Sequence, residues 1–135
     1  MIENGGFKTC IKCKETKDIT FSLTYKTEFG QVLAIVGNHP KVGKWTDYNI
    51  GLMKWYTGDL WKVTIKDLVV DEPFEYKYVV IDFKTKEAIR WEQGRNRICD
   101  PSYLSQEVCS KFNQSLSIHD DWEHFTVTFS IYFPG

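Results

Sequence analysis

The chain has 135 residues and a mass of 15.8 kDa, which suits a single domain large enough to bury a hydrophobic core. Its 17 Lys and Arg residues are balanced by 18 Asp and Glu residues, so the basic stripe typical of nucleic-acid-binding proteins is not expected, and no apolar run approaches the roughly 18 residues of a membrane-spanning helix. Aromatic residues make up 16% of the chain, more than a core of this size requires. Some of these rings should therefore lie on the surface for a functional reason.

The first strands are predicted from two different hydrophobic patterns. Residues 1–17 have no hydrophobic periodicity and are expected to form a leader or linker, with the folded module spanning 18–122. Within the module, residues 19–25 alternate apolar and polar side chains, which predicts a strand with one buried face. After a turn at Glu28-Phe29-Gly30, residues 32–36 are apolar throughout, which predicts an interior strand.

Later strands follow turn signals at intervals of roughly ten residues. After a weakly patterned segment at 52–55, alternation predicts strands at 61–65 and Phe74–Asp82, followed by short strands at Ile89–Trp91 and Leu116–Ile118. The sequence shows no convincing amphipathic helix pattern. Short strands separated by turns therefore predict an all-β fold, an antiparallel β-sandwich of immunoglobulin-like type.

The end of the chain repeats a pattern from the start of the module. Residues 126–133 alternate apolar and polar side chains, and Thr128–Ile131 (TFSI) resembles Thr20–Leu23 (TFSL). Residues 123–135 are therefore interpreted as either an extra strand of the sandwich or the start of a second copy of the module. The repeat favours the second copy.

The four cysteines leave three alternatives open. Cys10 and Cys13 form half of a zinc-ribbon motif, but Cys99 and Cys109 lack the close spacing that would complete it. A Cys99–Cys109 disulfide suits an exported protein, whereas free thiols suit a reducing compartment. The N-terminus lacks the basic start and apolar stretch of a secretory signal. A cytoplasmic protein with free thiols is expected, or an extracellular one if a signal has been removed.

A polar and aromatic cluster at 91–97 indicates the functional surface. Its sequence, WEQGRNR, places a tryptophan beside a carboxylate, amides and two guanidinium groups at the end of a predicted strand. Such a group has little use in a hydrophobic core, but it suits a surface that binds a flat ligand rich in hydroxyl groups. A carbohydrate-binding surface is therefore predicted.

Catalysis is not expected from these residues. No pair of carboxylates is marked out by its context as in glycosidases, and Gly37–Lys44 lacks the glycine spacing and the Ser or Thr of a phosphate-binding loop. His39, His119 and His124 are too scattered to suggest a metal site, so neither a metal nor a cofactor is expected. An immunoglobulin-like sandwich can also bind proteins, and a protein-interaction module without glucan binding stays open as the alternative function.

Six motifs across residues 18–122 resemble the starch-binding domains of carbohydrate-binding module family 20. They occur in the family's order and spacing: Phe29-Gly30-Gln31, Ile35-Val36-Gly37-Asn38, Val42-Gly43-x-Trp45, Gly58-Asp59-x-Trp61, Phe74-Glu75-Tyr76-Lys77-Tyr78 and Trp91-Glu92 with Asn96-Arg97. The resemblance implies an immunoglobulin-like β-sandwich that binds α-1,4-glucans such as starch, glycogen and maltooligosaccharides without catalysis. It also implies a setting beside a tandem module or a catalytic domain, as in 4-α-glucanotransferases and amylases.

The resemblance further implies the residues of the main site. This site falls on Trp45, Lys77, Trp91, Glu92 and Asn96. Two tryptophans would cover sugar rings, and the lysine, carboxylate and amide would bind sugar hydroxyls. Taken alone, Trp45 would suit a core position and Lys77 a solvated strand, but their occurrence together with Trp91 and Asn96 favours binding.

A second family site falls on Phe29, Tyr56 and Trp61. The family usually has tyrosine at the position of Phe29, and whether Trp55 or Tyr56 would face a ligand stays open. Trp61 also alternates in phase with the apolar residues at 63 and 65, which favours a core position for its ring.

Overall fold

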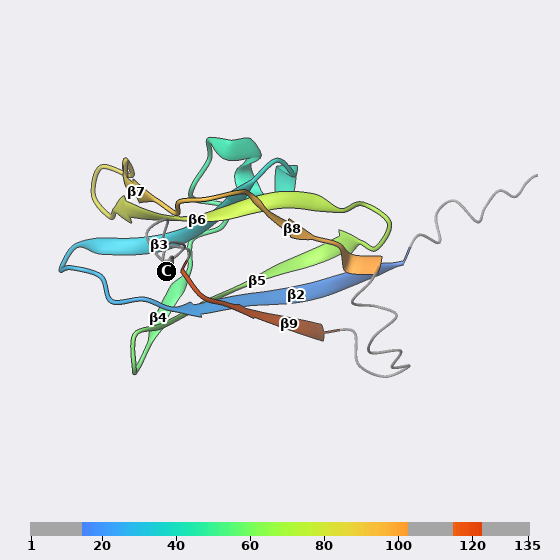
Figure 1. Ribbon diagram of the computed structural model, residues 1–135, viewed down its shortest axis with the longest axis horizontal. Helices are drawn as coiled ribbons and strands as arrows, with labels where there is room; N and C mark the ends of the chain where they lie inside the picture. The colour runs from blue at the N-terminus through green and yellow to red at the C-terminus, as the bar shows by residue number, and fades with distance from the viewer. Residues whose placement is uncertain (1–14, 103–114, 123–135) are drawn as a thin grey trace, which may run out of the picture.

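Two β-sheets packed face to face make up the part of the protein that the structure describes (Figure 1). A computed structural model describes residues 15–102 and 115–122. Sheet 1 has the strand order β4-β5-β2-β9, and sheet 2 has the order β3-β6-β7 with β8 also paired to β6. The elements are β2 (Thr16–Thr24), β3 (Gln31–Gly37), the 3-10 helix η2 (Pro40–Trp45), β4 (Lys54–Tyr56), β5 (Leu60–Val69), β6 (Phe74–Asp82), β7 (Ala88–Trp91), β8 (Arg97–Cys99) and β9 (Ser115–Asp120).

The predicted β-sandwich is confirmed, with two differences in detail. β2 begins at Thr16, so the last two residues of the predicted leader belong to the first strand. β9 runs parallel to β2, pairing Asp18 with Ser115, whereas the other strand pairs are antiparallel. Turn signals reveal hairpins but not the crossovers that bring strands together in parallel. The predicted strand or second copy at 123–135 lies outside the described residues.

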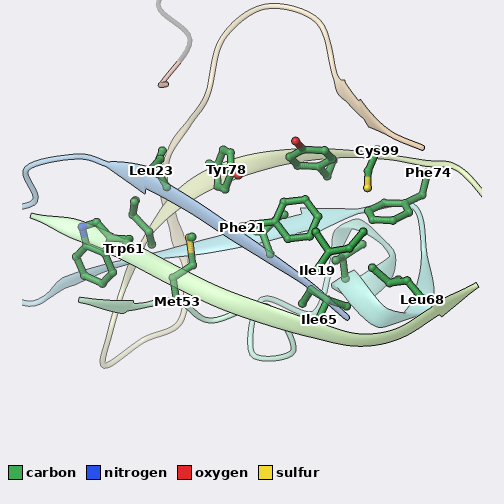
Figure 2. Close-up of a cluster of buried hydrophobic side chains, with 14 of the residues drawn as sticks. Ile19, Phe21, Leu23, Met53, Trp61, Ile65, Leu68, Phe74, Tyr78 and Cys99 are labelled. Atoms are coloured by element: carbon green, nitrogen blue, oxygen red, sulfur yellow. The ribbon is translucent and has the colours of Figure 1, made fainter. Parts of the chain in front are cut away.

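The main core lies between the inner faces of the two sheets (Figure 2). The alternating side chains Ile19, Phe21 and Leu23 of β2 are fully buried there, as their period-two pattern predicted. Trp61 lies at one end of this core and Phe74 at the other. The predicted core position of Trp61 is confirmed, because only 4% of this residue is exposed.

Sheet 2 is covered on its outer face as well. This explains why residues 32–36 are apolar throughout instead of alternating. The segment that follows β3 crosses this outer face (Figure 1) and packs three side chains onto it. The covering side chains are Trp45, Tyr48 and Leu52, and the buried residues beneath them are Ala34, Val36, Val79 and Ile81. Two aromatic rings are thereby fixed on the outside of the sandwich.

The chain changes sheets just after this covering segment. Ile35 N donates a hydrogen bond to Gly51 O at 3.0 Å, and Met53 N donates to Leu33 O at 2.9 Å, before the chain joins β5 as β4. A Cβ atom on Gly51 would lie 2.1 Å from Ile35 O, so only glycine fits at this close approach. This switch between sheets explains why the segment at 52–55 shows only a weak strand pattern.

Cys99 carries a buried free thiol at the end of the core, and the other three cysteines lie outside the described residues. Burial, together with the nearby charges of Asp100 and Asp120, raises the pKa of the Cys99 thiol from 9.0 to about 12. The folded state therefore keeps the thiol neutral at a pH at which the unfolded chain ionises it. Its contribution to stability is complete below pH 9 and is lost as the pH rises towards about 12.

We expect the free energy of unfolding to fall with pH above about 9 by up to about 1.4 kcal/mol per pH unit from this thiol. Urea unfolding at pH 8 to 10.5 should show a shallower decline for Cys99→Ala than for the wild type. The ionisation of Tyr76 and Tyr78 also favours unfolding at high pH. Both tyrosines are present in both chains, so their effects on the free energy of unfolding cancel in the comparison. Equal slopes would contradict the buried-thiol assignment.

No helix in the described part of the chain is long and apolar enough to cross a membrane.

Candidate functional site

The structure brings Trp45 and Trp91 together on the outer side of sheet 2. Trp45 ends η2 and Trp91 ends β7, and their ring centroids lie 6.4 Å apart with the ring planes inclined at 49°. Trp91 is 37% exposed, and Trp45 is half-buried above the sheet. Two segments far apart in the sequence thus present an angled pair of indole rings. We call this feature, formed by the rings of Trp45 and Trp91, the Trp45–Trp91 surface.

The turn that carries Trp45 has an unusual backbone. Lys44 and Trp45 have positive φ angles of 50° and 67°, a region that side chains of this size rarely occupy. The turn is closed by Asp47 N, which donates a hydrogen bond to Gly43 O at 2.9 Å. A left-handed residue costs about 1–2 kcal/mol, and such strain is typical of functional sites.

Lys77 holds the loop that follows Trp91. Its Nζ atom donates hydrogen bonds to the carbonyl oxygens of Glu92 at 3.2 Å, Gly94 at 2.5 Å and Arg95 at 3.2 Å. An ammonium group has three N–H donors, so these bonds engage all of them. The charge of Lys77 is therefore directed at the backbone of the loop that follows Trp91, and its contact with a ligand stays a prediction.

Asn96 lies at the other end of this loop. Its Nδ2 atom donates to Glu75 Oε1 at 2.9 Å, and the side chain is exposed. The loop from residue 92 to residue 96 is thus tied to β6 at both ends, by Lys77 and by Asn96.

Glu92 is placed differently from its predicted role. Its side chain has no exposed area, and its carboxylate accepts hydrogen bonds from Tyr78 N at 3.2 Å and from Arg97 Nε and Nη2 at 3.0 and 2.5 Å. Neighbouring residues of an extended chain point to opposite sides. Because Trp91 faces outward, Glu92 faces the interior. In this structure the carboxylate binds Arg97 and is not presented to a ligand.

A polar network continues from Glu92 across the sandwich. Arg97 Nη1 lies 3.3 Å from Asp120 Oδ1, and the hydroxyls of Tyr76 and Tyr78 donate to Asp120 Oδ2 at 2.8 and 2.7 Å. Asp120 belongs to β9 of sheet 1, whereas both tyrosines belong to β6 of sheet 2. The network therefore joins the two sheets beneath the loop that follows Trp91.

Burial sets the protonation of this network. Burial and the charge of Asp120 raise the pKa values of Tyr76 and Tyr78 well above their usual range, so both hydroxyls stay neutral donors. Burial lowers the pKa of Arg97, but hydrogen bonding to Glu92 and the charges of Glu92 and Asp120 outweigh it and raise the pKa overall. Arg97 is thus a permanent cation between two carboxylates.

The residues of the second predicted site are only partly brought together. An open groove of about 630 Å³ lies between the β2–β3 turn and the β4–β5 hairpin; it is lined by Thr27, Glu28, Phe29, Gly30, Gln31, Trp55, Asp59 and Trp61. Phe29 is fully exposed, whereas Trp61 contributes little surface and donates its indole N–H to Tyr25 O at 2.9 Å. Tyr56 does not line the groove, because Trp55 and Tyr56 are neighbours in β4 and face opposite sides.

Tyr56 lies instead beside two cations. Lys54 Nζ and Lys62 Nζ lie 5.7 and 5.3 Å from the centroid of its ring.

Within residues 15–102 and 115–122, no three His, Cys, Asp or Glu side chains are grouped so as to hold a metal ion.

Comparison with known proteins identifies the family. Residues 16–111 match the family model described as "Starch binding domain". The chain belongs to the starch-binding domain family. An α-amylase from Streptomyces violaceus is 32% identical to this starch-binding domain over 78 residues, which cover 58% of this chain and 13% of the amylase. The chain thus spans about an eighth of that enzyme's length. The family favours glucan binding over the protein-interaction alternative.

Solved structures share the fold of this starch-binding domain. A glycoside hydrolase family 15 glucoamylase from Hypocrea jecorina matches with a TM-score of 0.65 and 20% identity, over 90% of this chain and 20% of the glucoamylase. The glucoamylase of Hormoconis resinae matches with a TM-score of 0.59 and 22% identity, over 80% of this chain and 17% of the other. At these identities the likeness shows the β-sandwich fold.

Of two further aromatic residues at the sites of this starch-binding domain, Tyr48 was not predicted, and the choice between Trp55 and Tyr56 had stayed open. Tyr48 lies beside Trp91, with ring centroids 6.0 Å apart, and Trp55 lines the groove next to Phe29. Tyr48 lies in a loop without periodicity, so no pattern predicted its position. For Trp55 a signal existed, since alternation from Trp55 to Tyr56 implied that only one of them faces the groove, but so short a strand gave no register.

Proposed function

We propose that this domain binds α-1,4-glucans, such as starch, glycogen and maltooligosaccharides, through the Trp45–Trp91 surface. The observation that carries the proposal is the inclination of 49° between the two indole rings at a centroid distance of 6.4 Å. Each glucose presents a patch of C–H groups that an indole face can cover with a large rigid contact. An α-1,4-glucan curves, and two inclined rings follow that curve, whereas coplanar rings would favour straight chains such as cellulose.

Polar contacts would come from the loop after Trp91. Lys77 and Asn96 stay predicted ligand contacts, and each would exchange an internal hydrogen bond for one to a sugar hydroxyl. Since the exchanged bonds differ little in energy, the rings should supply most of the affinity. We therefore expect dissociation constants in the micromolar to millimolar range, which correspond to binding free energies of about −8 to −4 kcal/mol.

The groove between Phe29 and Trp55 supports a second, weaker glucan site. Phe29 and the half-exposed Trp55 supply aromatic surface from two different turns. The indole N–H of Trp55 donates to Asp59 Oδ1 at 3.0 Å, which fixes the ring. In this proposal Trp55 takes the role that the resemblance gave to Tyr56.

We also propose that the domain tethers an enzyme to its polysaccharide. The α-amylase that it resembles is several times longer than this chain, which supports an amylase as its parent. A 4-α-glucanotransferase parent and a tandem module beside the domain stay predictions from the family resemblance. A tether of modest affinity gains strength from a second module through effective concentration. The free thiol of Cys99 supports a reducing, cytoplasmic location.

The function is tested by titrating the chain with maltoheptaose and, separately, with cellohexaose while following heat or tryptophan fluorescence. We expect saturable binding of the α-1,4-linked sugar and none of the straight β-1,4-linked control. A folded chain that binds neither sugar would contradict glucan binding and would favour a protein-interaction module. Equal binding of both would contradict the role of the inclined rings.

A further inference from the structure

We propose that Tyr48 is a third ligand-binding residue of the Trp45–Trp91 surface, and that its hydroxyl group binds a hydroxyl of the glucan. The inference rests on the proposed glucan binding and adds a residue that neither the motifs nor the family resemblance assigned. It concerns the specificity of the site, since a fixed hydroxyl reads the position of a sugar hydroxyl, which an indole face does not.

Tyr48 adds a third aromatic ring beside Trp91. Its ring centroid lies 6.0 Å from that of Trp91, with the ring planes at 70°, so the two rings meet edge to face. Like Trp45, Tyr48 is half-buried and packs on the outer face of sheet 2. Trp91 thus has two aromatic neighbours, and the three rings form one surface.

The hydroxyl of Tyr48 is the feature that packing does not explain. Within the described residues it has no hydrogen-bond partner. By contrast, Tyr76 and Tyr78 donate to Asp120, and Tyr25 accepts a hydrogen bond from Arg90 Nη1 at 2.9 Å. Phenylalanine would cover the sheet equally well, so a tyrosine beside the indole pair points to a partner from outside the chain.

The loop around Tyr48 is held in place by its own hydrogen bonds. Asp47 N donates to Gly43 O at 2.9 Å, and Asn49 N donates to Asp47 Oδ1 at 3.1 Å. Leu52 then anchors the end of the loop in the same outer cluster. A ring held in this way binds a ligand with little loss of conformational freedom, which is how a single hydroxyl contributes measurably to affinity.

The test is Tyr48→Phe, which keeps the ring and its packing but removes the hydroxyl. Calorimetric titration with maltoheptaose should show binding about 3- to 10-fold weaker than for the wild type, as expected for the loss of one neutral hydrogen bond. Urea unfolding should show unchanged stability, because the hydroxyl has no partner within the described residues. Tyr25→Phe is the matched control: it also removes one tyrosine hydroxyl, outside the Trp45–Trp91 surface, and should keep wild-type affinity.

The outcomes separate this inference from the proposed function. If the wild type binds maltoheptaose and Tyr48→Phe binds equally well, the role of the Tyr48 hydroxyl is overturned and glucan binding stands. If the folded wild type does not bind, both are overturned. Weaker binding by Tyr48→Phe and Tyr25→Phe alike would overturn the assignment to the Trp45–Trp91 surface.

Discussion

Trp91→Ala is expected to weaken maltoheptaose binding by about 30-fold or more, to the limit of detection. Removing a central aromatic contact typically costs about 2–4 kcal/mol, and each 1.4 kcal/mol is roughly a factor of ten. Trp91 contacts both Trp45 and Tyr48, so its loss removes the middle of the aromatic surface. Because the residue ends the edge strand β7 and is 37% exposed, the chain should remain folded.

The matched control for this substitution is Phe83→Ala. Phe83 is also an exposed aromatic residue, 53% exposed, but it lies in the turn after β6 and is covered by Lys86 rather than by either tryptophan. Calorimetric titration should give wild-type affinity for Phe83→Ala. Near-normal affinity of a folded Trp91→Ala chain would show that the glucan binds elsewhere, and the Phe29–Trp55 groove would be the next candidate.

Arg97→Ala is expected to lower the free energy of unfolding by about 3–5 kcal/mol, the cost of leaving a buried charge without its partner. Glu92 has no exposed side-chain area, and Arg97 is its counterion. Asp120 loses the same partner. The whole free energy of unfolding of a domain of this size is about 5–15 kcal/mol. The variant should therefore unfold at a much lower urea concentration than the wild type.

Arg95→Ala provides the comparison for this result. Arg95 lies in the same loop but is exposed, and its backbone carbonyl, which accepts from Lys77, is retained. Removing the Arg95 side chain should change the free energy of unfolding by no more than about 0.5 kcal/mol. Adding Glu92→Gln to Arg97→Ala should recover part of the lost stability, since the unpaired buried charge is then removed. Equal stability of the Arg97→Ala and Arg95→Ala chains would contradict the network.

Local patterns were sufficient for most of the fold. Alternation in β2 and in the first half of β6 identified buried faces. The continuous apolar run of β3 predicted an interior strand, and the structure shows this strand covered on both faces. The parallel pairing of β9 with β2 was not predictable, because register between strands far apart in sequence leaves no local signal. The segment at 52–55 showed only a weak strand pattern because the chain passes from one sheet to the other just after Gly51.

The site was predictable only in part. The family resemblance implied that Trp45 and Trp91 belong to one site, and the structure brings their rings together. Glu92 turned inward because it follows the outward-facing Trp91 in an extended chain, and its carboxylate is paired there with Arg97. Tyr48 had no motif to identify it, since its position depends on how the loop after η2 lies over sheet 2.

The indole N–H signals of the five tryptophans, followed by two-dimensional NMR as maltoheptaose is added, test most directly whether the Trp45–Trp91 surface binds glucan. The Trp45 and Trp91 signals should move together and saturate along one binding curve. The Trp61 signal should stay in place, because this ring is 4% exposed and its N–H is bonded to Tyr25 O. Saturating sugar that leaves the Trp45 and Trp91 signals unmoved would contradict a glucan site on this surface.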